Sequence, residues 1–210
     1  MNKSHKLHIF DMDGTILDSM PMWATIASDY LDSYNIPHDD GVNKLIESYT
    51  LENAAKYFIK LGLNKTVDEI IKDIYDFSFN KYKYEIPAKP GMIELLKKLH
   101  ESGDTICLLS ASPVQCAKAA FDRLGILNFF NKLLSCQDLE TDKTVPETFI
   151  NVAASLGFKP KDTIVYEDAL YSILSAKKAG CNTAAIYDDF AKNEWNEILK
   201  NADEIIVKPL

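Results

Sequence analysis

Arginine is almost absent from this sequence: Arg123 is the only one, against 22 lysines. Enzymes that clamp phosphate with several arginines are therefore a poor fit to this composition. Basic residues as a whole are outnumbered, with 23 lysines and arginines against 31 aspartates and glutamates, so the net charge is −8. This negative balance argues against nucleic acid or an anionic membrane surface as the main partner.

Cysteine pairs and long apolar runs are also lacking. The four cysteines show no Cys-x-x-Cys spacing, which favours separate reduced thiols over a disulfide framework or a zinc site. No apolar run reaches the length of a membrane-spanning helix, and the first residues lack the apolar segment of a signal peptide. We therefore expect a cytoplasmic protein that does not contact a membrane. Nothing in the sequence indicates an obligate assembly, so a monomer or a weak dimer is expected.

What the sequence does contain is one stretch around which the rest is organised. The apolar run from Leu7 to Phe10 meets two acids, Asp11 and Asp13, and then Gly14. This pattern predicts a buried strand that ends in a tight turn. Two carboxylates at the end of a strand repel each other unless a cation lies between them, and a hard divalent cation is the natural choice.

The segment from residue 18 to residue 86 shows helical spacing and no strand alternation. Helices are predicted from Ser19 to about residue 35, over residues 42–48 and 51–61, and from Val67 to Ile74. Two prolines and a glycine in residues 86–91 mark its end. We predict an all-helical insert of residues 18–86 within a core formed by residues 1–17 and 87–210.

After residue 91, short apolar runs alternate with helical patterns. Strands are predicted at residues 105–109, 132–135, 163–166, 183–186 and 204–207, with helices between them, the last of these at residues 191–200. Such alternation is typical of parallel βαβ units. The predicted fold is therefore α/β, with a doubly wound, Rossmann-like parallel sheet.

Polar residues follow three of these strands, and parallel strands present their carboxyl ends at one edge of the sheet. The hydroxyl of Ser110 and free amides such as that of Ala111 can hold a phosphoryl oxygen there. Lys143 can supply a positive charge, and Glu167 and Asp168 a second acidic pair. Each of these residues also has an interpretation without a role in binding or catalysis. Ser110 can cap a turn, Lys143 can be a solvated lysine, and Glu167 and Asp168 can be acids at the amino end of a helix.

These residues, in this order, resemble the four motifs of the haloacid dehalogenase superfamily of phosphohydrolases and phosphomutases. The first motif is the run from Asp11 to Thr15, Asp-Met-Asp-Gly-Thr, and the others centre on Ser110, on Lys143 and on the pair at 167–168. The insert resembles the helical cap of the β-phosphoglucomutase-like and phosphoglycolate-phosphatase-like subgroups. One departure is Thr144, which stands where the usual Lys-Pro-x-Pro pattern has its first proline.

The resemblance implies a role for each residue. Asp11 would attack phosphorus, and Asp13 would act as acid and base. Asp11, the backbone carbonyl of Asp13 and Asp168 would bind Mg²⁺, with Glu167 ordering a bound water. Lys143 would neutralise the nucleophile and the phosphate, which Ser110 and Ala111 would help to hold.

The expected function is therefore a magnesium-dependent phosphatase acting through an aspartyl-phosphate on a small soluble monoester, such as a sugar phosphate, a nucleotide or phosphoglycolate. A phosphomutase of the β-phosphoglucomutase type and a non-catalytic phosphate-binding regulator are alternatives. Trp23 stands where similar mutases carry a cap histidine, and residues 18–86 contain no arginine for a second phosphate, which favours a phosphatase. Trp23 could stack on a substrate ring, but its place on an apolar stripe favours packing within the insert.

Overall fold

The computed structural model describes residues 5–46 and 49–207. The chain forms two compact units: an α/β unit of Met1–Asp18 with Ile86–Leu210, and a helical unit of Ser19–Glu85. The boundaries of the helical unit lie one residue inside those of the insert expected from the sequence.

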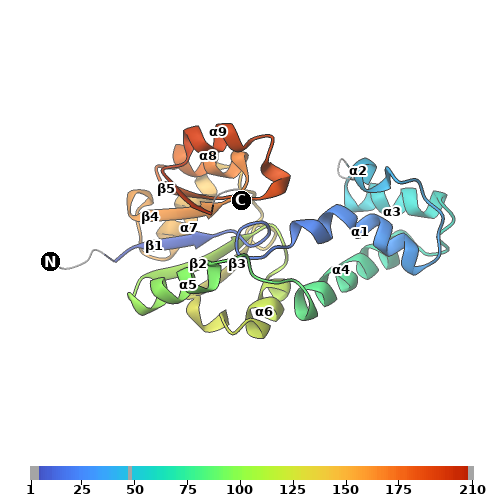
Figure 1. The fold of residues 1–210 in the computed structure, drawn as a ribbon, viewed down its shortest axis with the longest axis horizontal. Helices are drawn as coiled ribbons and strands as arrows, with labels where there is room; N and C mark the ends of the chain where they lie inside the picture. The colour runs from blue at the N-terminus through green and yellow to red at the C-terminus, as the bar shows by residue number, and fades with distance from the viewer. Residues whose placement is uncertain (1–4, 47–48, 208–210) are drawn as a thin grey trace. The chain divides into compact units, whose positions relative to one another are not determined.

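The α/β unit is built on one parallel sheet (Figure 1). Its strands, in the spatial order β3-β2-β1-β4-β5-β6, are β1 (Leu7–Phe10), β2 (Thr105–Ser110), β3 (Lys132–Ser135), β4 (Thr163–Glu167), β5 (Asn182–Ile186) and β6 (Glu204–Val207). From β1 the chain builds outward through β2 and β3, and it then returns to add β4 on the other side of β1. This reversal makes the β1/β4 pair the point where ligands bind in such sheets. The predicted doubly wound α/β fold is confirmed.

Helices cover both faces of this sheet, with α8 and α9 on one side and α5 and α6 on the other (Figure 1). The helices of this unit are α5 (Met92–Glu101), α6 (Val114–Arg123), α7 (Pro146–Ser155), α8 (Leu170–Lys178) and α9 (Trp195–Asn201). Burial on both faces explains why every residue of β1 and β4, and every residue of β2 after Thr105, is buried, without the alternation of a half-exposed strand. The helix predicted at residues 191–200 is shorter at its start. There the Asp188 side chain accepts a hydrogen bond from Phe190 N (2.9 Å) and begins a short 3-10 helix, Asp189–Ala191.

The helical unit consists of α1 (Met20–Ser33), α2 (Val42–Ile46), α3 (Leu51–Lys60) and α4 (Val67–Tyr84). The helix predicted at 42–48 reaches into residues 47–48, which lie outside the described residues. Helix α4 runs on to Tyr84 because buried residues continue past Ile74 at the same four-residue spacing, at Ser78 and Tyr82. Among the described residues, no helix combines the length and the apolar character that crossing a membrane requires.

Candidate active site

The first acidic residue lies at the carboxyl end of β1. Asp11 N donates a hydrogen bond to the carbonyl oxygen of Tyr166 (3.0 Å), so the ladder between β1 and β4 extends to this residue. Gly14 then adopts a positive φ of 79°, which an L side chain disfavours, and its N–H bonds to the Leu17 carbonyl (3.0 Å). The turn thus ends the strand abruptly and leaves the buried side chain of Asp11 at the edge of the sheet.

Four charged side chains meet at this edge. The Lys143 ammonium is paired with Asp11 and also donates to Glu167 Oε1 (2.6 Å). A carboxylate oxygen from each of Asp11, Glu167 and Asp168 lies within 4.8 Å of the others. All four side chains are buried, so three acids share one buried cation.

This excess of negative charge shifts the pKa values of the cluster. Burial, reinforced by the neighbouring carboxylates, raises the pKa of Asp11 to about 7 against the pull of Lys143. Burial, with the charges of Glu167, Asp11 and Asp188, raises the pKa of Asp168 well above its usual value against the pull of Lys143. Burial lowers the pKa of Lys143, but Asp11 and Glu167 outweigh it and hold this pKa well above the usual value. The cluster therefore favours a second cation.

The carboxylates differ in how many of their oxygens the protein already uses. Glu167 accepts hydrogen bonds from Ser172 Oγ at Oε1 (2.8 Å) and from Asp168 N and Ala169 N at Oε2 (3.2 and 3.3 Å). Asp168 accepts a bond from Thr15 Oγ1 (3.2 Å) at one oxygen. Buried oxygen donors of this kind fit a hard divalent cation such as Mg²⁺. Asp11 and Asp168 are better suited to direct ligation than Glu167.

The second acid of the turn, Asp13, is joined to the end of β2. Ser112 Oγ donates to Asp13 Oδ2 (2.6 Å), and Ser112 N donates to Ser110 Oγ (3.0 Å). Ser110 is buried, whereas Ala111 between the two serines is exposed. Ser112 is thus a residue of this site to which the sequence analysis assigned no role.

Lys143 lies in the loop before α7, where a threonine replaces the expected proline. The side chain of Asp142 accepts bonds from Thr144 N (2.7 Å) and from the Thr144 hydroxyl, while Thr148 Oγ1 donates to the Asp142 carbonyl (2.8 Å). These bonds constrain the backbone on both sides of Lys143. Hydrogen bonding here takes the place of the rigidity that proline supplies.

A buried ion pair lies beside the cluster. Lys89 Nζ lies 2.6 Å from Asp188 Oδ2 and donates to the Tyr187 carbonyl (2.7 Å), and both charged side chains are buried. Lys89 N also bonds to the Ile16 carbonyl (2.9 Å), which ties the start of the second core segment to the turn after β1. The charge of Asp188 contributes to the raised pKa of Asp168, so Lys89 balances an acid that would otherwise add to the repulsion.

The sequence contained signals for some of these unassigned residues. Ser112 is two residues beyond Ser110, and Asp188 follows the end of β5 much as Asp168 follows the end of β4. Lys89 had no such signal, because its partner is 99 positions away and belongs to a different strand end.

A family model described as haloacid dehalogenase-like hydrolase matches residues 8–186 of this chain. The chain is 25% identical to validoxylamine A 7'-phosphate phosphatase of Streptomyces hygroscopicus subsp. limoneus, over 96% of both sequences. It is 23% identical to hexitol phosphatase B of Escherichia coli O157:H7, over 92% of this chain and 88% of that one.

Among solved structures, the chain resembles a putative beta-phosphoglucomutase from Thermotoga maritima. The TM-score is 0.79 and the sequence identity 20%, over 96% of this chain and 94% of that one. At this identity the likeness establishes a shared fold and leaves the reaction open.

Proposed function

The chain belongs to the haloacid dehalogenase-like hydrolases, and from this premise we propose that it hydrolyses a small phosphate monoester through an aspartyl-phosphate formed on Asp11. The observation that carries the proposal is the buried cluster in which Lys143 contacts Asp11 and Glu167, with Asp168 beside them. A solvated turn needs no such arrangement, because buried acids without a task are costly.

In the first step, an Asp11 carboxylate oxygen attacks phosphorus and the bond from phosphorus to the ester oxygen breaks. Asp13 gives its proton to that leaving oxygen. In the second step, Asp13 takes a proton from water, whose oxygen attacks phosphorus and releases Asp11. Division into two displacements makes each one easier than direct attack by water. The bond from Ser112 holds the Asp13 carboxylate in a defined orientation for both transfers.

The remaining residues act on charge and position. Lys143 partly neutralises Asp11 and the phosphoryl group, and Ser110 with the backbone at Ala111 orients the phosphoryl oxygens. We assign Mg²⁺ to Asp11, Asp168 and the backbone carbonyl of Asp13, with Glu167 acting through a bound water. When bound, the ion supplies positive charge that offsets repulsion between the phosphate dianion and the carboxylates.

Magnesium is expected to stabilise the wild-type protein, and replacement of Asp168 by asparagine (Asp168→Asn) should abolish the effect. In chelator, the contribution of Asp11 to the free energy of unfolding should fall as the pH rises from 3.8 to about 7. Folding raises the pKa of Asp11 from the first value to the second, so in this range the folded protein holds a proton that the unfolded chain releases. Mg²⁺ binds the ionised carboxylates, so its stabilisation should be largest above that range, about 2.7 kcal/mol at a hundredfold excess over Kd.

Thermal melts with Mg²⁺ or chelator at several pH values measure this effect. Asp122→Asn, which neutralises an exposed acid on α6, is the matched control and should respond to Mg²⁺ as the wild type does. A magnesium shift of equal size in Asp168→Asn would remove that residue from the metal site.

The substrate class proposed is a phosphorylated sugar, polyol or related small acid. Two of the phosphatases to which the chain is similar are named for validoxylamine A 7'-phosphate and for hexitols, and other relatives of comparable identity are named phosphoglycolate phosphatases. A mutase would need groups that grip a second phosphate. The helical unit has no arginine for this task, so hydrolysis is preferred over isomerisation.

A panel of phosphate esters tests the proposal. Hexose phosphates, hexitol phosphates, phosphoglycolate and nucleoside monophosphates are incubated with the full chain and Mg²⁺. We expect inorganic phosphate from at least one sugar or polyol phosphate and none in chelator. Conversion of β-glucose 1-phosphate to glucose 6-phosphate without free phosphate would instead establish the mutase, and inactivity towards every ester would favour a binding role.

A further inference from the structure

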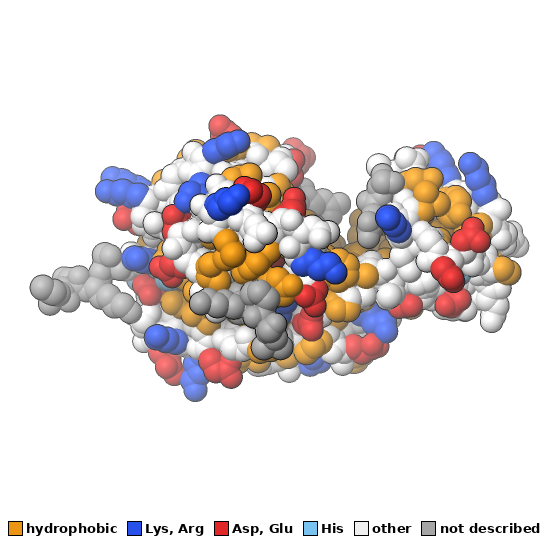
Figure 2. All heavy atoms as spheres, turned by 45° about the horizontal axis from the view of Figure 1, so that its top comes forward, with side chains coloured by type: hydrophobic (Ala, Val, Ile, Leu, Met, Phe, Trp, Pro, Cys, Tyr) orange, Lys and Arg blue, Asp and Glu red, His pale blue; other side chains and the backbone are white. Residues whose placement is uncertain are grey.

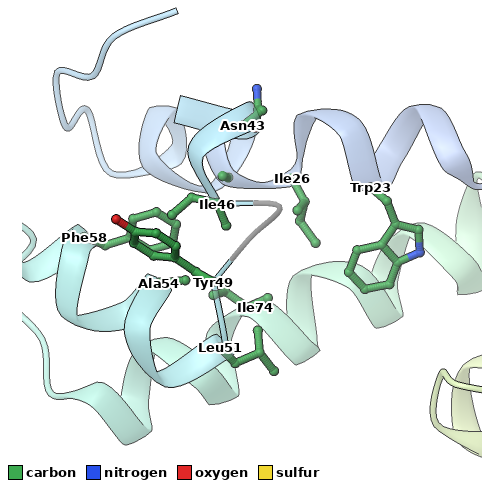
Figure 3. Close-up of a pocket in the computed structure, with 10 residues that line it drawn as sticks. Trp23, Ile26, Asn43, Ile46, Tyr49, Leu51, Ala54, Phe58 and Ile74 are labelled. Carbon is green, nitrogen blue, oxygen red and sulfur yellow. The ribbon is translucent and has the colours of Figure 1, made fainter. Parts of the chain in front are cut away.

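The helical unit contains a cavity of about 230 Å³ that the proposed reaction does not explain (Figure 3). It lies between α1, α2, α3 and α4, and all ten residues that line it belong to this unit. It is open to solvent, so it is a pocket of this unit rather than an interior void left by imperfect packing. An apolar pocket is a candidate site for a small ligand.

The walls of the cavity are almost entirely apolar. Trp23 and Ile26 come from α1, Ile46 from α2, Phe58 from α3 and Ile74 from α4. None of the ten lining residues carries a charge. A charged group placed among them would lose its hydration without gaining a partner, so the cavity excludes ions.

Two polar groups in the wall are bonded to the protein itself. Asn43 donates to Ser28 Oγ (2.8 Å) and accepts from Ser28 N (3.0 Å), which occupies both ends of its amide. The indole N–H of Trp23 donates to the hydroxyl of Tyr82 (3.0 Å). Because its N–H is bonded to Tyr82, the indole of Trp23 presents an apolar surface to the cavity. Tyr49 provides the one hydroxyl among the ten residues.

The cavity opens at an apolar surface. Tyr49 and Leu51 are each 38% exposed, and Figure 2 shows hydrophobic side chains gathered on the helical unit where α2 and α3 lie. Exposed apolar groups around an opening are typical of a binding site. An apolar cavity of about 150 Å³ is known to hold benzene, so this one accommodates a six-membered ring with a small substituent.

We propose that this cavity is a binding site for a small uncharged ring, aromatic or alicyclic. The ring can belong to a separate small molecule or to the organic part of the phosphate ester. Only the second source rests on the proposed function, whereas the binding itself does not. The chemistry is shared, because both sources present an apolar ring to the apolar walls of the cavity.

The experiment uses Trp23 as its reporter. The chain has two tryptophans, and Trp195→Phe in the α/β unit leaves Trp23 as the only one. This variant of the full chain is titrated with toluene and with cyclohexanol, excited where neither compound absorbs. We expect saturable changes in emission and a rise in melting temperature, and no response to benzoate at the same concentrations because of its charge.

Variants that fill the cavity test where binding occurs. Ala54→Leu and Ala27→Val add methyl groups to two walls and should raise Kd at least about tenfold. Ile59→Phe on α3, an exposed position outside the lining, should bind as the parent does. If no ring compound alters Trp23 emission or the melting temperature, or if both filled variants bind unchanged, the inference is wrong.

Turnover distinguishes the two sources of the ring. If the substrate supplies it, Ala54→Leu should raise KM for phenyl phosphate and not for glycerol phosphate, and toluene should compete with the phenyl ester alone. If a separate molecule supplies it, the filled variant should treat both esters alike. A protein that binds toluene but hydrolyses no ester would contradict the proposed function and support this inference.

Discussion

Replacement of Asp11 by asparagine (Asp11→Asn) is expected to lower the rate of phosphate release by on the order of 10⁴-fold or more, as loss of a nucleophile does in other covalent catalysts. An amide oxygen has nearly the same shape as the carboxylate oxygen but lacks its negative charge. It can still accept a hydrogen bond from Lys143, so the fold should survive. The release of inorganic phosphate from the best ester of the panel measures the effect.

The unfolding temperature of Asp11→Asn and the kinetics of a second variant show whether the loss of activity is specific to the nucleophile. In chelator, Asp11→Asn should unfold at the same temperature as the wild type or higher, because the cluster then has two acids for one ammonium. Asp13→Asn should behave differently with p-nitrophenyl phosphate, whose leaving group needs no proton. One equivalent of p-nitrophenol should appear rapidly before slow turnover, whereas Asp11→Asn should show no burst. A burst from Asp11→Asn, or more than about 1% of wild-type turnover, would contradict a nucleophilic role.

The fold was predictable because its determinants are local in sequence. Each central strand is an apolar run bounded by turn residues, and burial on both faces requires such runs. The errors fall where apolar periodicity is weak. In α4 the buried stripe continues through Ser78 and Tyr82, and these residue types mark a core position less clearly than aliphatic ones do. Before α9, a side-chain cap by Asp188 produces a 3-10 turn that periodicity does not show.

The site was predictable to the extent that the parallel sheet aligns the strand ends. The alignment of strand ends predicts that Asp11 and the acidic pair at the end of β4 lie together. In the structure Asp11, Glu167 and Asp168 do so, although their roles remain predictions. The alignment does not predict contacts made by loops. The pairing of Lys89 with Asp188, and the volume left between the four helices, depend on three-dimensional packing that no spacing in the sequence records.

Replacement of Lys143 by methionine (Lys143→Met) should affect both stability and catalysis. Methionine replaces the aliphatic part of the lysine side chain but leaves Asp11, Glu167 and Asp168 buried without a cation. Removal of one partner from a buried ion pair costs about 3–5 kcal/mol. The loss of a charge that stabilises the reacting phosphoryl group should also lower kcat/KM on the order of 10²- to 10³-fold. Urea denaturation and phosphate release measure the two effects.

The pH and metal dependence of that cost distinguish a charge effect from lost packing. The raised pKa values of Asp11 and Asp168 should rise further without the ammonium, so the folded variant holds protons that the unfolded chain releases. Its stability should therefore be nearest to that of the wild type at low pH and fall as the pH rises past the usual carboxyl range, with partial recovery in Mg²⁺. Lys177→Met breaks an exposed pair with Asp203 (2.8 Å) and should cost less than about 1 kcal/mol. Equal costs at the two sites, independent of pH and metal, would mean that Lys143 serves packing rather than the charge balance of the cluster.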